Sequence, residues 1–447
     1  MRNLWSAIVL ALICASATAA ESPFAIYDRD PAHLWNRLYR AIAVRTEAGV
    51  DYGIDNSEPY HDGFDDPKTL TAVLDEFLKR HGEDRAPGAL RRALLQNDVW
   101  AAFDLATGPE TGKDGASLRR RLARVIGRLR MQSSQIAKLP DNYAQAVKSG
   151  AFAADFDPGR PDRAFLPPDL LDANGQWVEI GEDGLGAVTP FHLQMLSGRS
   201  VFRVFIRCPG GRNATLSYLD SLNLYPTPWA FRPADVATRT YPRPSKERWD
   251  PLRFDRATPQ LPQGTIVALV RQMMVIDDRL KPSPTSVTQK VQFRVFKDLN
   301  KPGGLPGGEQ DNGKFNSQQL VYEFVMRRRD LLAAEAGGLD RVTQDETEYQ
   351  LTTVLEGGSR ETRLRGPIVL ATCVRCHSPN GIFSVNTYSG SINGGIPSPF
   401  LKSNPQLLPA TSIGYQGNAT ADWKTSQFDW GLLRGLLEAD AQPPPLH

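Results

Sequence analysis

The chain is poor in cysteine and histidine, and it lacks the patterns that mark several common enzyme classes. It contains only four cysteines and six histidines among 447 residues. It has no Gly-x-Ser-x-Gly elbow, no His-Glu-x-x-His pair and no dinucleotide fingerprint following a strand. Four cysteines also cannot form the dense disulfide framework of a small secreted domain. Serine hydrolases with such an elbow, zinc proteases and nicotinamide-dependent dehydrogenases are therefore not expected.

Excess charge and long apolar runs are also lacking. The formal net charge is +2 at pH 7, and a chain this close to neutrality lacks the basic footprint of a nucleic-acid-binding protein. Beyond the first 20 residues, no segment approaches the roughly 18 consecutive apolar residues that a membrane-spanning helix needs. We therefore expect no nucleic-acid partner and no transmembrane segment in the mature chain.

The N-terminus has the pattern of a secretory signal peptide. Arg2 precedes an apolar run at residues 4–13, and a stretch of small residues follows. A positive start, a short apolar core and small residues at the cleavage point are typical of such signals. We expect residues 1–20 to be removed by cleavage near Ala19 or Ala20, which makes the mature chain periplasmic or extracellular.

The most informative motif is Cys-Val-Arg-Cys-His at residues 373–377. In an exported chain this order is typical of the covalent attachment of haem c. The thiols of Cys373 and Cys376 can form thioethers with the two vinyl groups of one porphyrin, and His377 is then the proximal ligand of the iron. The alternatives are a Cys-x-x-Cys disulfide or half of a zinc site, but zinc requires a second pair of ligands at compatible spacing. We expect one covalent haem c.

The region from about residue 360 to residue 440 resembles a class I cytochrome c domain. The points of similarity are a helix leading into the motif, an irregular loop and a closing helix around residues 428–437. In that family a proline-bearing loop offers a backbone carbonyl to the proximal imidazole, and the resemblance makes Pro397 the candidate for this contact with His377. The resemblance covers less than a fifth of the chain, and the upstream region is not assigned to a family.

The chain departs from that family at the second axial position of the iron. A class I domain usually supplies a methionine downstream of the motif, whereas this chain has no methionine after Met326. Either the distal position is open, or its ligand comes from elsewhere. The upstream candidates are Met326, Met195 and His192, together with Met273 and Met274 on a predicted strand. Less usual downstream candidates are Lys402, Lys424 and Tyr415.

Cys208 remains outside the motif once Cys14 has left with the signal peptide. It shares one face of an alternating run with Phe202, Val204 and Ile206, so we expect a buried and inert thiol. A role in redox sensing or intermolecular pairing is the alternative.

The apolar pattern changes along the chain from helical spacing to alternation. Leu118, Leu122 and Val125 keep helical spacing, whereas residues 201–208 and 265–276 read as strands, the second continuing into a hairpin. We predict an α+β, multidomain protein with a helical N-terminal region, a mainly β middle region and a small all-α cytochrome c-like C-terminal domain. The expected bounds are 21–150 for the helical region, 151–310 for the β region, 311–358 for connecting helices (one of them over 318–336) and 359–447 for the haem domain.

These observations predict electron transfer with a redox partner protein as the leading function. The alternative is a five-coordinate haem that acts as a peroxidase-like enzyme or a sensor of gases or other small molecules. Such an enzyme needs a distal acid or base, and His192 or Arg327 are candidates for it. Catalytic residues and oligomeric state are not specified by the sequence.

Overall fold

The computed structural model describes residues 22–47, 49–55, 64–108, 115–181, 188–225, 229–231, 252–254, 257–297, 299, 319–343, 346, 370, 377, 381–385, 408–410 and 415–441. His192 and His377 lie within these residues. Cys373, Cys376 and Pro397 lie outside them, as does the expected signal peptide.

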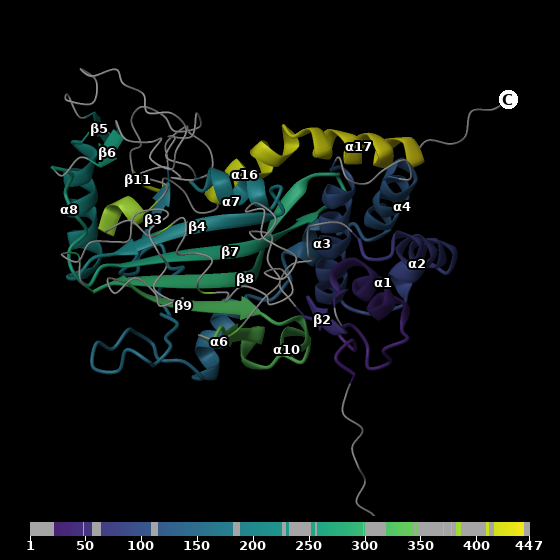
Figure 1. Cartoon of the computed structure of the whole chain (residues 1–447), viewed down its shortest axis with the longest axis horizontal. Helices are drawn as coiled ribbons and strands as arrows, with labels where there is room; N and C mark the ends of the chain where they lie inside the picture. The colour runs from purple at the N-terminus through teal and green to yellow at the C-terminus, as the bar shows by residue number, and fades with distance from the viewer. Residues whose placement is uncertain are drawn as a thin grey trace, which may run out of the picture.

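The centre of the fold is a seven-stranded antiparallel sheet (Figure 1). Its strands, in their order across the sheet, are β10 (Leu339–Arg341), β9 (Gln319–Met326), β8 (Pro282–Phe296), β7 (Ile266–Ile276), β4 (Ser200–Arg207), β3 (Val178–Gly181) and β11 (Leu408–Pro409). Two separate pairs are β1 (Arg45–Glu47) with β2 (Val50–Tyr52), and β5 (Trp229–Phe231) with β6 (Leu252–Phe254). The strands predicted at 201–208 and 265–276 and the hairpin that follows the second one are confirmed.

The two faces of the sheet differ in chemistry because successive side chains of a strand point to opposite sides. Val270 and Val291 are cross-strand partners and belong to the main core cluster. Arg271 and Lys290, the next pair, lie on the opposite side together with Arg294. We call this side of the sheet the cationic face and the other side the apolar face.

Aromatic side chains cover the apolar face. The ring of Phe165 lies 4.8 Å from that of Phe293 and 5.1 Å from that of Tyr322, and the ring of Trp177 lies 6.0 Å from that of Phe293. These separations are those of favourable tilted and edge-on aromatic pairs. The segment that precedes β3 is therefore part of the core of the sheet.

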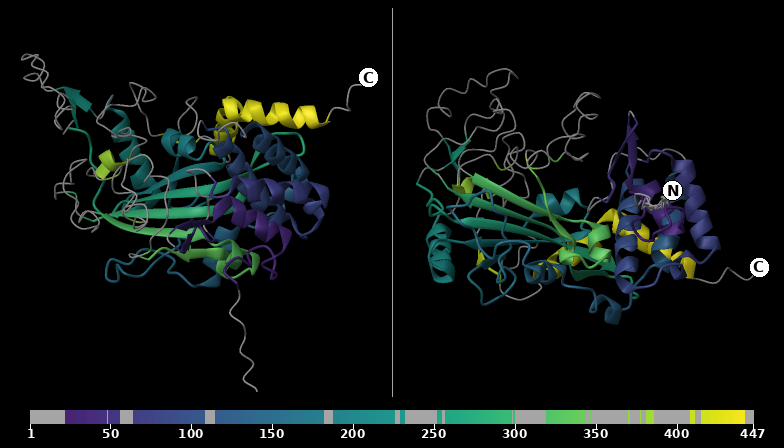
Figure 2. Two further views of the ribbon diagram at one scale, coloured as in Figure 1. Left: turned by 45° about the vertical axis from the view of Figure 1, so that its right-hand side comes forward. Right: turned by 90° about the horizontal axis from the view of Figure 1, so that it is seen from below.

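The first helices gather at one end of the sheet, as the two views of Figure 2 show. They are α1 (Leu34–Ala43), α2 (Pro67–Lys79), α3 (Ala89–Ala106) and α4 (Gly115–Arg128). The remaining described α-helices are α5 (Ser133–Ile136), α6 (Asn142–Ser149), α7 (Pro190–Met195), α8 (Gly211–Asn223), α10 (Arg328–Leu332), α16 (Tyr415–Thr425) and α17 (Phe428–Ala441). The start of α2 shows why these segments are helical: Asp66 accepts hydrogen bonds from the backbone N–H groups of Lys68 and Thr69, and Pro67 follows as the first helical residue.

Helix α3 joins this helical region to the sheet. The side-chain amide of Gln96 donates to the carbonyl of Ile276 at 2.9 Å and accepts from its N–H at 2.7 Å. Asn97 donates to the carbonyl of Met274 at 2.9 Å. One core cluster contains residues of both regions, among them Trp35 and Phe293. The chain is thus α+β, as predicted, and the helical and β regions share a single core.

The prediction of one helix over residues 318–336 is wrong. Gln319–Met326 forms strand β9 and pairs with β8 along its length, and only the short α10 follows. The segment contains alternating valine and aromatic residues, which pack well on a pleated surface. Its apolar side, with Tyr322 and Phe324, completes the apolar face.

The helix expected at residues 428–437 is confirmed as α17, but it packs against α4 of the helical region (Figure 1). The ring of Trp430 lies 5.8 Å from that of Trp100. A Cβ atom at Gly127 would come within 2.9 Å of Leu437, so the absence of a side chain lets the two helices approach closely. The apolar stripe of α17 therefore completes the main core cluster.

Candidate functional site

The histidine of the Cys-x-x-Cys-His motif is held by a backbone carbonyl. Nδ1 of His377 lies 2.8 Å from the carbonyl oxygen of Ser384. Because a carbonyl only accepts hydrogen bonds, Nδ1 carries the proton and the ring lone pair is on Nε2. Desolvation of the ring, followed by the charge of Arg294, keeps the pKa of His377 well below its usual value. The imidazole is therefore neutral, which is the form that binds a metal.

The carbonyl of Ser384 is positioned by a short 3-10 helix, η4 (Gly381–Ser384). Ile382 of this helix is fully buried in a second core cluster, which includes Val204 of β4. The N–H of Ile382 donates to Oε1 of Gln260 at 3.3 Å. Gly381 has a φ of +52°, and a Cβ there would lie 2.2 Å from the same oxygen, so glycine is required at this turn.

Pro397, the expected partner of the His377 ring, lies outside the described residues. The contact that was expected of it is made by Ser384. Sequence reasoning missed Ser384 because the acceptor is a backbone carbonyl, which every residue type provides. The only signal near it is the glycine that opens η4.

His192 lies on the short helix α7, between β3 and β4. Pro190 occupies its first position, and Leu193, which follows the histidine, is 1% exposed. The ring of His192 lies 5.3 Å from that of Phe202 on β4. Desolvation, followed by the charge of Arg294 and of two other cations of the cationic face, lowers the pKa of His192 to about 4.

The structure brings the rings of His192 and His377 together. Their centroids are 6.1 Å apart and the ring planes make an angle of 37°. The two residues are far apart in the sequence: His192 lies on α7 and His377 ends the Cys-x-x-Cys-His motif. Both imidazoles are neutral, and both feel the charge of Arg294.

The cationic face carries a buried hydrogen-bonded chain of charged and amide groups. Nζ of Lys290 lies 2.6 Å from Oε1 of Glu323, a fully buried residue. Gln292 donates to Oε2 of the same carboxylate at 2.6 Å and accepts from Nε of Arg294 at 2.9 Å. Gln292 thus links the Arg294 guanidinium to the Glu323 carboxylate through one hydrogen bond on each side.

The other candidate ligands have different surroundings. Met326 is fully buried in the main core cluster together with Tyr322 and Phe324, on the apolar face. Met195 is half-buried and lies three residues after His192 on α7. The placement of Met326 separates it from His377 by the thickness of the sheet, because the Ser384 segment packs on the other side.

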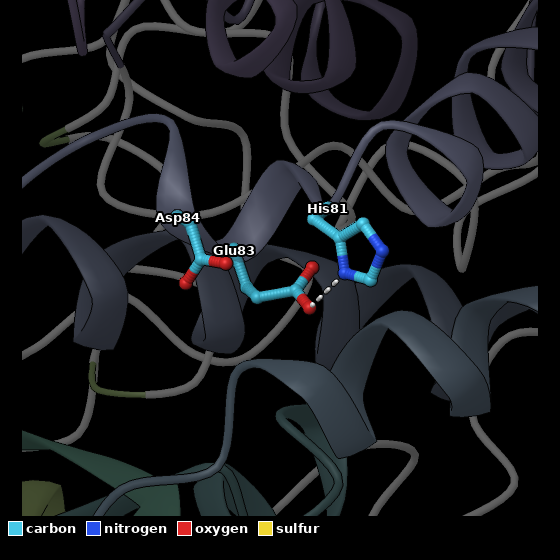
Figure 3. Close-up of side chains that lie close together, drawn as sticks. All are labelled: His81, Glu83 and Asp84. Carbon is cyan, nitrogen blue, oxygen red and sulfur yellow. Dashed lines mark ion pairs between the residues drawn. The ribbon is translucent and has the colours of Figure 1, made fainter.

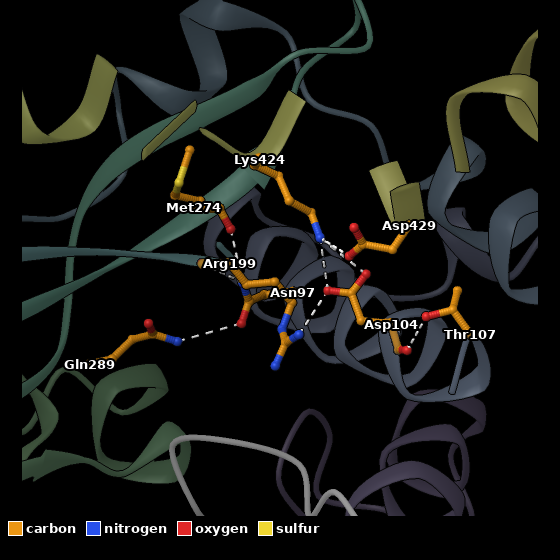
Figure 4. A network of polar contacts seen from close by, with 8 residues as sticks. All are labelled: Asn97, Asp104, Thr107, Arg199, Met274, Gln289, Lys424 and Asp429. Atoms are coloured by element: carbon orange, nitrogen blue, oxygen red, sulfur yellow. Dashed lines mark hydrogen bonds and ion pairs between the residues drawn. The ribbon is translucent and has the colours of Figure 1, made fainter. Parts of the chain in front are cut away.

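Lys424 is part of a buried ion-pair network that Figure 4 shows. Its Nζ lies 3.2 Å from Oδ2 of Asp104 and also contacts the carboxylate of Asp429. Arg199 donates to the same oxygen of Asp104 at 2.8 Å. The ammonium group is therefore engaged by two carboxylates and lies 5.3 Å from the centre of the Trp100 ring. Lys402 lies outside the described residues, and so does the side chain of Tyr415.

A small group of possible metal-binding side chains lies at the surface, far from these histidines in the sequence. It consists of His81, Glu83 and Asp84 (Figure 3). Nδ1 of His81 is 3.5 Å from Oε1 of Glu83, and Arg128 donates to the same oxygen at 2.9 Å. The ion pair with Arg128 accounts for the position of Glu83, and the histidine is 64% exposed. The group combines the exposed His81 and Asp84 with the largely buried Glu83, whose carboxylate is paired with Arg128.

Cys208 is a free, buried cysteine among the described residues. Burial raises the pKa of its thiol, and a raised pKa disfavours the reactive thiolate. Its N–H donates to Oγ1 of Thr215 at 2.8 Å. These features support the expected inert thiol. Arg327, the other candidate acid or base, pairs with Glu346.

Comparison with known proteins found no matching family model, no matching curated protein and no matching solved structure. Within the residues that the structure describes, no helix has both the length and the apolar character needed to cross a membrane. The Cys-x-x-Cys-His motif and the geometry around His377 are the features that bear on the function of the chain.

Proposed function

We propose that the protein is an exported monohaem c-type cytochrome that transfers electrons to or from a redox partner protein. Cys373 and Cys376 would hold the haem covalently, and His377 would ligate its iron. The signal-peptide pattern, with cleavage near Ala19 or Ala20, supports a periplasmic or extracellular location, which is where such haem attachment takes place.

The observation that carries this proposal is the hydrogen bond between the ring of His377 and the carbonyl of Ser384. Metal-ligating histidines usually donate their other ring N–H to a carbonyl or carboxylate, which fixes the tautomer and the ring orientation. Nδ1 of His377 has such a partner in the carbonyl of Ser384, and the ring is neutral. The residues present therefore fit a haem c at this motif. Haem c would supply one-electron exchange at its iron. The chain itself orients the imidazole and surrounds it with fixed charge.

The neighbouring ring of His192 favours electron transfer over the five-coordinate alternative. A peroxidase-like enzyme or a gas sensor needs room for a small molecule on the side of the iron opposite the proximal histidine. A second imidazole 6.1 Å from the first is well placed to occupy that side. Carbon monoxide distinguishes the two functions, because it binds readily only to an iron with an open or easily vacated position.

Replacing both Cys373 and Cys376 with alanine is expected to abolish covalent haem. The two thioethers are the only bonds that would survive denaturation, so haem staining on a denaturing gel should disappear. Cys208→Ala is the matched control and should stain as strongly as the wild-type chain, because the Cys208 thiol is buried in the second core cluster. Staining that persists in the double variant would rule out the attachment.

Arg294→Gln is expected to lower the reduction potential. A cation near the iron favours the reduced state, which has one positive charge fewer. Acting over roughly 10 Å through an effective dielectric constant of about 20, a unit charge contributes about 1.5 kcal/mol, or about 60 mV for one electron. A redox titration measures the shift.

The matched control for this potential is Arg203→Gln, on the apolar side of the sheet. Arg203 is paired with both oxygens of Glu179 at 2.8 and 2.7 Å, so its charge is largely compensated. We expect its removal to shift the potential much less. An unchanged or higher potential in Arg294→Gln would mean that the cationic face does not act on the redox centre.

A further inference from the structure

We propose that His192 is the sixth ligand of the iron, so that the haem is held between two histidines. This inference rests on the function proposed above. It departs from the histidine–methionine pair implied by the resemblance to class I cytochromes c, and it brings the distal ligand from the β region, nearly 200 residues upstream of the motif.

The separation of the two rings matches the one that a shared metal would require. With metal–nitrogen bonds of about 2 Å on each side, two imidazoles that bind one metal from opposite directions have centroids roughly 6 Å apart. The observed separation of His192 and His377 is 6.1 Å. Their planes can rotate independently about the two metal–nitrogen bonds, so the angle of 37° fits the same arrangement.

The tautomer of His377 fits this role. Only the neutral imidazole offers a lone pair to a metal. His377 keeps Nε2 for this purpose because Nδ1 is bonded to Ser384.

The position of His192 is set by packing rather than by a mobile loop. Leu193 anchors α7 in the core, and the turn that leads to β4 is in close contact with α16. A Cβ at Gly198 in that turn would lie 3.0 Å from the ring of Trp423. Phe202 supports the imidazole from the sheet. A ligand held by such contacts keeps its geometry in both oxidation states, which suits electron transfer.

The competing candidates are less well placed. Met326 lies on the apolar face and faces the main core cluster. Met195 shares α7 with His192 at a spacing of three residues, which places both on the same side of the helix. Met195 is therefore the natural matched control, since it tests whether α7 supplies a sulfur ligand instead.

The test is the visible spectrum of three full-length exported proteins: the wild type, His192→Gly and Met195→Leu. The wild type and Met195→Leu should be low-spin in both oxidation states, without the sulfur-to-iron charge-transfer band, and should not react with carbon monoxide. His192→Gly should be high-spin and bind carbon monoxide. Added imidazole should fill the space left in His192→Gly and restore the low-spin spectrum.

Two outcomes would overturn this inference. The first is a low-spin spectrum of His192→Gly without added imidazole, and the second is conversion to high spin in Met195→Leu. Rescue by imidazole distinguishes loss of a ligand from misfolding, because a misfolded chain does not regain a low-spin spectrum at low imidazole concentration. Haem staining on a denaturing gel distinguishes a failure of the inference about His192 from a failure of the proposed function. All three proteins should stain, and an unstained wild type would overturn the proposed function itself.

Discussion

Replacing Arg328 with methionine is expected to lower the free energy of unfolding by about 3–5 kcal/mol, because it leaves a buried carboxylate without its cation. Arg328 is 1% exposed and its guanidinium contacts the carboxylate of the fully buried Asp98. The hydroxyl of Tyr27 donates to the other oxygen of Asp98 at 2.6 Å. The guanidinium also lies 5.1 Å from the centre of the Tyr39 ring.

This cluster joins the helical region to the sheet. Asp98 belongs to α3, and Arg328 opens α10 directly after β9. Burial raises the pKa of Asp98, and the charge of Arg328 opposes that shift. In Arg328→Met the carboxyl group is expected to take up a proton or to lose its burial, and either change costs stability.

Urea unfolding measures the effect. The double variant Arg328→Met with Asp98→Asn should recover part of the loss, because no buried charge then remains unpaired. Arg434→Met is the surface control: its partner Glu438 is 2.7 Å away and both are at least half exposed, so the cost should be below about 1 kcal/mol. A loss as small in Arg328→Met as in Arg434→Met would contradict the account.

Lys424→Met is expected to cost about 3 kcal/mol at pH 8, since it removes the shared cation of two carboxylates from a buried network. Asp104 keeps Arg199 as a partner, whereas Asp429 loses the ammonium that lowers its pKa. The network ties α16 to α3 and to the first turn of α17 (Figure 4).

The cost should be smaller at pH 5 than at pH 8. Burial raises the pKa of Asp104 to about 6, above its value in the unfolded chain. Between pH 4 and 6 the folded state therefore binds more protons than the unfolded state, and the contribution of this group to stability falls as the pH rises. Removal of Lys424 raises the folded pKa further, so protonation relieves more of the cost at low pH. Unfolding of the wild type and Lys424→Met at both pH values tests this, and an equal cost at pH 5 and pH 8 would contradict it.

The sequence predicted the elements whose pattern is local. Residues 265–276 and the hairpin after them were identifiable because apolar residues and turn residues alternate in the expected order. Strand β9 was mistaken for a helix because a short apolar run fits both periods. Because β9 is a strand, the side chain of Met326 lies on the apolar face with those of Tyr322 and Phe324. Met326 is therefore a core residue and a poor candidate for an iron ligand.

The sequence did not predict which elements pack together when they are far apart in the chain. The apolar stripe of α17 was visible, but the stripe does not say that its partner is α4. The same limit applied to the site: His192 was one of several candidates for the distal position, and its proximity to His377 depends on the packing of α7 against β4. The contact of Ser384 with His377 could not be predicted from the sequence, because a backbone carbonyl makes it.

The intact mass of the purified exported chain in denaturant, measured together with its visible spectrum, tests whether the protein carries haem c. We expect a chain that begins after Ala19 or Ala20 and carries the mass of one haem, with the spectrum of a haem bound through two thioethers. A chain of unmodified mass, colourless after denaturation, would contradict it.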